Sequence, residues 1–277
     1  MKLNSVQPIE QFNNQSVSAP GVPAPAVGTA IRILDYLAKQ HPRAGVTDIA
    51  RALGVSKSSC FNILATLSQF GMLSKLPGGA QYQLGPRLAA LAGAARRQYS
   101  YREVLQRHFG DLAAETHLVC VVGQPLGDDT SFVIIDQIVP PGFRLRNLAP
   151  RVGTVVPLSG PALGRALLSG MDDLEALQII RHMIPNFSMA DETEFKRELR
   201  EVRERGYAVS LERYQKGINA VAVAIEKAGE PYLVVGLVGD STDFTVERIH
   251  QLGPNLAERA RALRSAISDT PYLMVAT

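Results

Sequence analysis

Apolar residues recur with a helical spacing in three consecutive segments near the start of the chain. The first helix is expected from Thr29, with apolar residues three or four positions apart at Ala30, Ile33, Leu34, Leu37 and Ala38. A second, shorter helix is expected to be capped by Thr47 and ended by Gly54, and a third to run from a Ser56 cap to about Phe70. Two short helices joined by a tight turn are typical of a DNA-binding helix-turn-helix.

The third helix is predicted to have two faces of different character. Its core face is apolar and consists of Cys60, Ile63, Leu64, Leu67 and Phe70. Its opposite face carries short, uncharged hydrogen-bonding groups, namely Ser58, Ser59, Asn62, Thr66 and Gln69. An ordinary surface helix would carry Glu and Lys there, because both are good helix formers. The polar face therefore predicts a surface that approaches base edges and phosphates closely.

A hairpin and a further helix are expected next. Met72–Leu76 and Gln81–Leu84 are short apolar runs on either side of a Pro-Gly-Gly turn, which predicts a winged helix-turn-helix. Lys75 on this wing is placed to contact a phosphate or the minor groove; the alternative is a solvated lysine on an edge strand. Pro86 opens an Ala- and Leu-rich helix to about Arg97, which we interpret as a linker that pairs with its copy in a dimer, or else as a spacer.

The second half of the chain mixes strand-like and helical patterns. The expected strands are Leu118–Val122, Phe132–Val139, Phe143–Leu148, Tyr207–Leu211, Asn219–Glu226 and Tyr232–Val238. The expected helices are one with Val104, Leu105, Phe109, Leu112 and Ala113 on one face, then Pro161–Ser169, Leu174–Ile180, a charged helix from an Asp191/Glu194 capping box to Gly206, and Thr245 to about Ile267. This order favours an α+β fold, in which helices pack against a mainly antiparallel sheet.

Charge is distributed unevenly along the chain. Residues 49–102 hold seven Lys or Arg and no Asp or Glu. Residues 28–97 hold nine basic against two acidic residues, a balance of +7, whereas residues 98–277 hold nineteen against twenty-three, a balance of −4. Acidic groups are excluded where a polyanion approaches, so the split favours a nucleic-acid-binding module followed by a module with another task. The alternative is ordinary fluctuation of surface charge.

Several classes of protein are disfavoured by what the sequence lacks. Cys60 and Cys120 have no metal-ligand spacing, so we expect buried free thiols in a reducing cytosol. The sequence has no apolar run typical of a signal peptide and none of the ~18 residues that a membrane span requires, so a cytoplasmic protein without a membrane partner is expected. Phosphate-binding loops and hydrolase motifs are missing and the five histidines are scattered, so we expect neither an enzyme nor a cofactor.

Several short segments occur together in an order that is specific. In the first half they are Ala30-Ile31-Arg32-Ile33-Leu34, Ser56-Lys57-Ser58-Ser59 and Leu64-Ala65-Thr66-Leu67. In the second half they are Arg151-Val152-Gly153, Pro157-Leu158, Ala162-Leu163-Gly164-Arg165-Ala166-Leu167-Leu168 and Val202-Arg203-Glu204-Arg205-Gly206-Tyr207-Ala208-Val209. With them, the chain resembles the IclR family of bacterial transcription regulators over about residues 28–267.

The resemblance implies a domain organisation and a function. A composition rich in Gln, Asn, Ser and Pro predicts a flexible tail (1–27), and the residue pattern predicts a winged helix-turn-helix (28–85) and a linker helix (86–99). The resemblance implies that the remainder (100–270) is a GAF-like domain that binds a small organic acid as effector. The family acts as dimers or tetramers on operator DNA near catabolic genes. The residues implied to border the effector pocket are Ser159, Gly160, Ser210, Glu212, Asn219, Ala220, Gly236 and Val238.

Departures from the family pattern refine the expectation. Many members carry a pair of acidic residues where this sequence has Ser210-Leu211, and a Cys where it has Ala220. They carry a Ser-x-Ser where it has Gly236 and Val238. We therefore expect a less polar pocket and a larger or more aromatic acid, because apolar walls require apolar ligand surface. Asn62 stands where an Arg is frequent, which favours adenine over guanine in the operator.

The expected DNA contacts divide into two kinds. The candidate residues are Thr47, Arg51, Ser56, Lys57, Ser58, Ser59, Asn62 and Lys75. Among them, Arg51, Lys57 and Lys75 are expected to attract phosphates. Ser58, Ser59 and Asn62 are expected to contact bases. The alternative function is a winged-helix protein-interaction scaffold with a small-molecule or metal-binding sensor domain.

Overall fold

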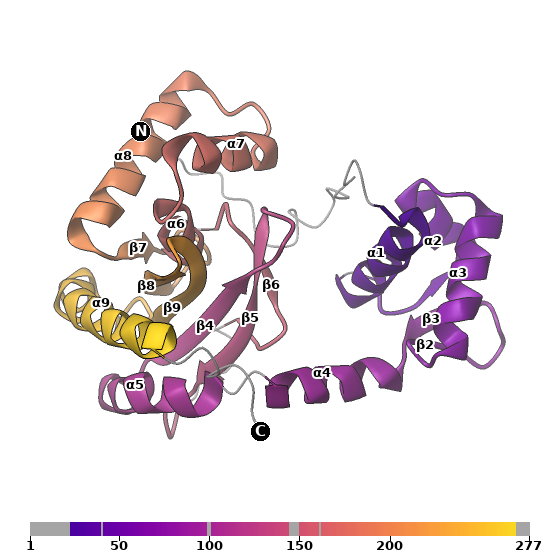
Figure 1. Cartoon of the computed structure of the whole chain (residues 1–277), viewed down its shortest axis with the longest axis horizontal. Helices are drawn as coiled ribbons and strands as arrows, with labels where there is room; N and C mark the ends of the chain where they lie inside the picture. The colour runs from indigo at the N-terminus through magenta and orange to yellow at the C-terminus, as the bar shows by residue number, and fades with distance from the viewer. Residues whose placement is uncertain (1–22, 40, 99–100, 144–149, 161, 270–277) are drawn as a thin grey trace. The chain divides into compact units, whose positions relative to one another are not determined.

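The chain folds into two compact units. The computed structural model describes residues 23–39, 41–98, 101–143, 150–160 and 162–269 (Figure 1). Residues up to 98 belong to one unit and residues from 101 onward to the other. Within the described residues, none of the helices combines the length and the apolar character that a membrane span requires.

The N-terminal unit is a winged helix-turn-helix followed by a further helix. Its helices are α1 (Pro25–Lys39), α2 (Val46–Leu53), α3 (Lys57–Gln69) and α4 (Pro86–Gln98), and its strands are β1 (Ala44–Gly45), β2 (Leu73–Lys75) and β3 (Gln81–Leu84). The strands form an antiparallel sheet in the order β1-β3-β2. Ile33, Ile49, Leu64 and Leu73 bring three helices and the wing into one buried core.

Two helix starts differ from those predicted. α1 begins at Pro25 instead of Thr29, because proline is favoured in the first turn of a helix, where its missing N–H has no partner to lose. α2 begins at Val46 after Gly45, so Thr47 lies inside the helix and was wrongly predicted as its cap. The cause is β1, which was not predicted: Gly45 pairs with Gln81 and is therefore held in an extended conformation.

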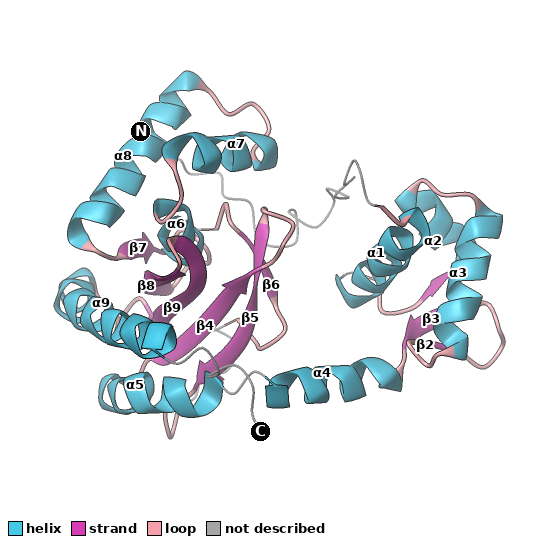
Figure 2. Ribbon diagram, viewed as in Figure 1, coloured by secondary structure: helices cyan, strands magenta, loops and turns pink. Residues whose placement is uncertain are grey.

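The C-terminal unit is an antiparallel sheet between two layers of helices (Figure 2). Its strands are β4 (Val119–Pro125), β5 (Ser131–Ile138), β6 (Val155–Pro157), β7 (Ala208–Leu211), β8 (Ile218–Lys227) and β9 (Glu230–Asp240), in the order β6-β5-β4-β9-β8-β7. Its helices are α5 (Tyr101–Thr116), α6 (Ala162–Ser169), α7 (Asp173–Met183), α8 (Met189–Arg205) and α9 (Val246–Asp269). The predicted α+β architecture is confirmed.

The period of two along the strands divides this unit into two cores. On β4, Val119 and Val121 pack with α6, α7 and α8, whereas Cys120 and Val122 pack with α5 and α9. The strands are therefore buried on both faces, which explains their nearly continuous apolar runs. Cys60 and Cys120 are buried free thiols, as predicted.

Details of this unit confirm some predictions and correct others. Thr245 caps α9 as predicted: its hydroxyl accepts a hydrogen bond from the N–H of Arg248 at 3.4 Å, and its carbonyl accepts one from the N–H of Ile249 at 2.9 Å. The capping box of α8, however, is formed by Ser188 and Asp191, not by Asp191 and Glu194. Glu194 pairs with Arg197 on the helix surface instead.

One predicted strand falls mostly outside the described residues. Of the expected strand Phe143–Leu148, only Phe143 is described, and it lies in irregular structure. The strand β6, which was not predicted, pairs with β5 through Phe132 opposite Val156. Its three residues are too short for a recognisable alternating pattern.

Candidate nucleic-acid interface and ligand cavity

The turn between α2 and α3 has a fixed geometry. Gly54 has φ 67° and ψ 32°, in the left-handed region that glycine adopts most easily. The N–H of Val55 donates to the carbonyl of Ala50 at 3.1 Å, closing the end of α2. From α1, the guanidinium of Arg32 donates to the carbonyl of Leu53 at 2.9 Å. These contacts set the direction in which α3 leaves α2.

The start of α3 is held by serine hydroxyls. Ser56 is the cap, as predicted, and its hydroxyl accepts a hydrogen bond from the N–H of Ser59 at 3.1 Å. The hydroxyls of Ser56 and Ser58 are 3.2 Å apart. Further along, the hydroxyl of Thr66 donates to the carbonyl of Asn62 within the helix, so this donor is already used.

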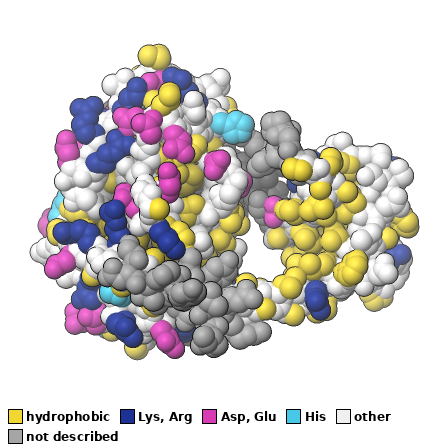
Figure 3. Space-filling view, in the orientation of Figure 1, with side chains coloured by type: hydrophobic (Ala, Val, Ile, Leu, Met, Phe, Trp, Pro, Cys, Tyr) yellow, Lys and Arg dark blue, Asp and Glu magenta, His cyan; other side chains and the backbone are white. Residues whose placement is uncertain are grey.

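All eight candidate DNA-contacting residues are exposed, and the structure brings them to α2, α3 and the wing. Arg51 lies in the last turn of α2 and Lys57 is the first residue of α3. Lys75 ends β2, and its ammonium nitrogen lies over the wing turn, where a methyl group added to Gly79 would be 3.9 Å away. On the face of the molecule that Figure 3 shows, charged side chains are many over the C-terminal unit and few over the N-terminal one.

The apolar face of α3 is narrower than predicted. Cys60 and Leu64 are fully buried, but Phe70 is 68% exposed, so its place in the core stripe was wrongly predicted. The reason is that α3 ends at Gln69, and Gly71, with φ 70°, turns the chain away. Phe61, on the same helix, is also exposed, by 52%.

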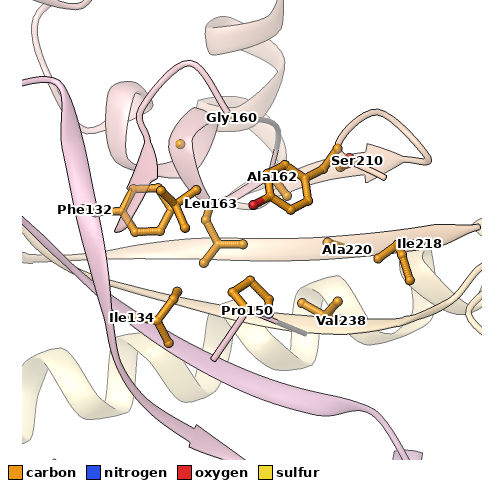
Figure 4. Close-up of a pocket in the computed structure, with 13 residues that line it drawn as sticks. Phe132, Ile134, Pro150, Gly160, Ala162, Leu163, Ser210, Ile218, Ala220 and Val238 are labelled. Carbon is orange, nitrogen blue, oxygen red and sulfur yellow. The ribbon is translucent and has the colours of Figure 1, made fainter. Parts of the chain in front are cut away.

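The C-terminal unit contains a cavity between the sheet and α6. Its volume is about 40 Å³. Its walls include Phe132 and Ile134 of β5, Leu163 of α6 and Val238 of β9 (Figure 4). Val156 of β6 also lines it. These side chains are apolar and come from segments more than 100 residues apart along the chain.

The polar groups at this cavity are few and buried. Ser210 lines it, and its hydroxyl has no hydrogen-bond partner within the described part of the chain. The same holds for the hydroxyl of Ser159, just before α6, although Ser159 does not line the cavity. Tyr214 lines it too, and burial raises the pKa of its phenol to about 12. A ligand here meets apolar walls and neutral hydroxyl groups.

Half of the candidate effector-binding residues line the cavity. Those that line it are Gly160, Ser210, Ala220 and Val238, and those that do not are Ser159, Glu212, Asn219 and Gly236. The side-chain amide oxygen of Asn219 accepts a hydrogen bond from the N–H of Glu212 at 3.0 Å. Its amide nitrogen donates one to the carbonyl of Phe244 at 2.8 Å. Gly236 lies under α6, since a methyl group there would be 3.4 Å from Leu163.

Other cavity residues were missed from the sequence. Phe132 and Ile134 alternate on a predicted strand, so their common face was a signal that could have been used. Tyr214 lies in the loop between β7 and β8, where no periodicity indicates the direction of a side chain.

A buried ion-pair cluster connects that loop to α6. Glu198 of α8 accepts from Arg165 of α6 at 2.8 Å and from Arg213, next to Tyr214, at 2.7 Å. The guanidinium of Arg165 also lies 4.9 Å from the ring centre of Phe195. Burial alone would raise the pKa of Glu198, but the two arginines hold this pKa below its ordinary value.

Metal ligation has little support in this geometry. Across the described ranges, no three His, Cys, Asp or Glu side chains come together as potential metal ligands.

Known proteins resemble this chain along most of its length. Residues 26–77 match the model of the IclR helix-turn-helix domain, and residues 95–265 match that of the bacterial transcriptional regulator IclR C-terminal domain. The chain is 28% identical over 246 residues to the glycerol operon regulatory protein of Streptomyces coelicolor, covering 86% of this chain and 93% of that protein. It is 20% identical to the transcriptional repressor IclR of Escherichia coli, covering 88% and 92%.

A solved structure of an IclR-type regulator is also similar to this chain. The crystal structure of an IclR transcriptional regulator from Alicyclobacillus acidocaldarius is similar with a TM-score of 0.74 and 30% identity. The similarity covers 88% of this chain and 99% of that one.

Proposed function

This chain belongs to the IclR family of bacterial transcriptional regulators, and from this premise we propose a function for each of its two units. It is a DNA-binding transcription regulator with a ligand-binding C-terminal domain. In our proposal, α3 enters the major groove of an operator, and a small, partly apolar organic acid, preferably aromatic, occupies the C-terminal cavity and controls operator affinity. The observation that carries the effector class is the apolar wall of that cavity, together with buried hydroxyls beside it that have no hydrogen-bond partner in the described ranges.

On the DNA side, charge and short polar groups have separate roles. Arg51, Lys57 and Lys75 attract phosphates, while Ser58, Ser59 and Asn62 contact base edges; Thr47 and Ser56 lie beside them at the helix starts. A dimer places two copies of α3 in successive major grooves, so the operator is a near-palindrome with half-sites ~34–36 Å apart. The exposed Leu91 and the alanines of α4 support pairing of this helix with its copy in a dimer.

The volume of the cavity limits which effectors fit it, as the polarity of its walls does. The carboxylate accepts hydrogen bonds from the hydroxyl of Ser210 on β7, which lines the cavity, and from that of Ser159 just before α6. Neither hydroxyl has a hydrogen-bond partner among the described residues. The cavity of about 40 Å³ has room for only a few water molecules, whereas an apolar cavity that holds benzene measures ~150 Å³. A ring-sized acid therefore binds a more open arrangement of the walls, and its binding energy shifts the population toward that arrangement.

The change reaches DNA through the helix α4. A different arrangement of the C-terminal unit alters how far apart the two copies of α3 are held. Because coupling is reciprocal, operator DNA must change effector affinity by the same factor as the effector changes operator affinity.

A panel of ligands tests the effector class. Thermal unfolding of the full chain is measured with benzoate and hydroxybenzoates, and in parallel with glyoxylate and pyruvate. At a hundredfold excess over Kd, a ligand should add about 2.7 kcal/mol to the stability of the folded state. We expect this gain only with ring-containing acids. Stabilisation by the two- and three-carbon acids alone would contradict the proposal.

Control by the effector is tested on DNA. The probe is duplex DNA flanking the gene of this protein, in a binding-shift assay with and without the acids that stabilise the protein. A change in duplex affinity with the stabilising acids supports the proposal, and an identical affinity with and without them contradicts it.

A further inference from the structure

Phe61 is an exposed phenylalanine at the edge of the face of α3 that carries the candidate DNA contacts. It is 52% exposed, and its neighbours one turn away, Lys57, Ser58 and Ala65, are exposed as well. At ~100° per residue, Phe61 lies about 60° around the helix from Ser58 and about 100° from both Asn62 and the buried Cys60. The ring therefore flanks the polar face and lies outside the core of the unit.

The position of the ring along the helix also matters. Phe61 is the fifth residue of α3, and the N-terminal part of a recognition helix is the part that contacts base edges. Phe70, the other exposed phenylalanine of this segment, follows the helix and lies about 180° around it from Phe61.

The surroundings of Phe61 limit what can cover it. Residues 49–102 contain no carboxylate, and Lys57 lies one turn before the ring, so the surface is complementary to a polyanion. The apolar group that a polyanionic major groove presents is the C5-methyl of thymine, and phenylalanine is among the side chains that contact it.

We propose that Phe61 packs against the C5-methyl group of a thymine in each operator half-site and makes that thymine a specificity position. This inference rests on the proposed function and adds to it a base that the hydrogen-bonding residues do not select. Ser58 and Asn62 then supply directional contacts, and the ring supplies a contact that depends on one methyl group.

The test removes the methyl group from the DNA and the ring from the protein. Duplexes that the full chain retains are selected from a random library, and each thymine is replaced singly by deoxyuridine, which keeps base pairing. We expect one thymine per half-site at which the replacement weakens wild-type binding by about three- to tenfold. Phe61→Ala should weaken binding to the thymine duplex by a similar factor and bind the two duplexes equally.

Phe70→Ala is the matched control, because it removes an exposed ring directly after the end of α3, about 180° around the helix axis from Phe61. It should keep the preference for thymine over deoxyuridine. Circular dichroism and sedimentation of the Phe61→Ala protein should match those of wild type, since the ring is outside the core.

The inference is overturned if Phe61→Ala keeps the methyl dependence, if wild type shows none, or if the variant changes only the oligomeric state. In those cases salt-sensitive binding by wild type leaves the proposed function in place. Failure of wild type to retain any duplex overturns both.

Discussion

The recognition helix α3 and the cavity of the C-terminal unit use side chains in opposite ways. On α3, the candidate residues are exposed and polar. Around the cavity, Phe132, Ile134 and Val156 form the wall and are also part of the buried core. This difference means that the residues of α3 that bind DNA do not also stabilise the fold, whereas the residues that form the cavity wall do both. Substitutions on α3 should change DNA binding at nearly constant stability, whereas those around the cavity should change both.

The largest expected effect breaks the ion-pair cluster behind the cavity. Glu198→Gln leaves the buried Arg165 without a counter-charge and should lower the free energy of unfolding of the C-terminal unit by about 3–5 kcal/mol at pH 7. Glu201→Gln, which removes an exposed partner of Arg197 on the same helix, should cost less than about 1 kcal/mol. Urea unfolding with hydrogen exchange of α6 and α8 measures both variants. Equal losses would show that the cluster contributes no more than a surface pair.

The pH dependence of this effect has a defined sign. The folded-state pKa of Glu198 is lowered by the two arginines, so its contribution is complete above the ordinary carboxyl pKa of about 4.3 and is lost as pH falls through the lowered folded value. The difference in stability between wild type and Glu198→Gln should therefore narrow below about pH 4. A difference that grows on acidification would contradict the assigned charge state.

The next effect concerns the exposed face of α3. Asn62→Ala should reduce discrimination at one base position by about 1–3 kcal/mol. Lys57→Ala should weaken all sequences similarly and reduce the salt slope by about one. Neither change should alter unfolding, because both side chains are exposed. Footprinting on a common operator set distinguishes them, and uniform losses for both would remove Asn62 from base recognition.

The smallest effect concerns the buried hydroxyl of Ser210. Ser210→Ala should raise the stability of the ligand-free protein by about 1 kcal/mol, because it removes a buried polar group that has no hydrogen-bond partner in the part of the chain that the structure describes. The same change should reduce stabilisation by the effector. The matched control is Ser131→Ala, whose hydroxyl donates to Asp128 at 2.6 Å, and which should lower stability instead. Thermal unfolding with and without ligand measures both, and a stability loss on Ser210→Ala would show that this hydroxyl is satisfied.

The sequence predicted the two regions to different extents. The polar face of α3 was predicted because helical periodicity is local: Ser58 and Asn62 need only their own helix to be placed. The order of elements in the C-terminal unit followed likewise from apolar runs rich in β-forming residues, and Ala228 and Gly229, both with positive φ, form the predicted turn between β8 and β9.

The cavity and the ends of some helices could not be predicted, because they depend on contacts between residues distant in sequence or on where a helix ends. The cavity joins Phe132 of β5 to Tyr214 of a loop, and no local pattern predicts that these residues meet. Thr47 was wrongly assigned as the cap of α2. The cap is Gly45, which pairing with β3 holds in an extended conformation, and the helix begins directly after it. Phe70 was wrongly placed in the core because the pattern continued past the residue at which the helix ends.

The salt dependence of operator binding by the full chain tests the role of α3 and its wing most directly. Arg51, Lys57 and Lys75 in two copies give six phosphate contacts, so the logarithm of affinity should fall against the logarithm of salt concentration with a slope of about −5. A steep slope near this value is the predicted result. An affinity that stays constant across the salt range, with both units folded, would contradict the assignment of α3 and its wing to DNA.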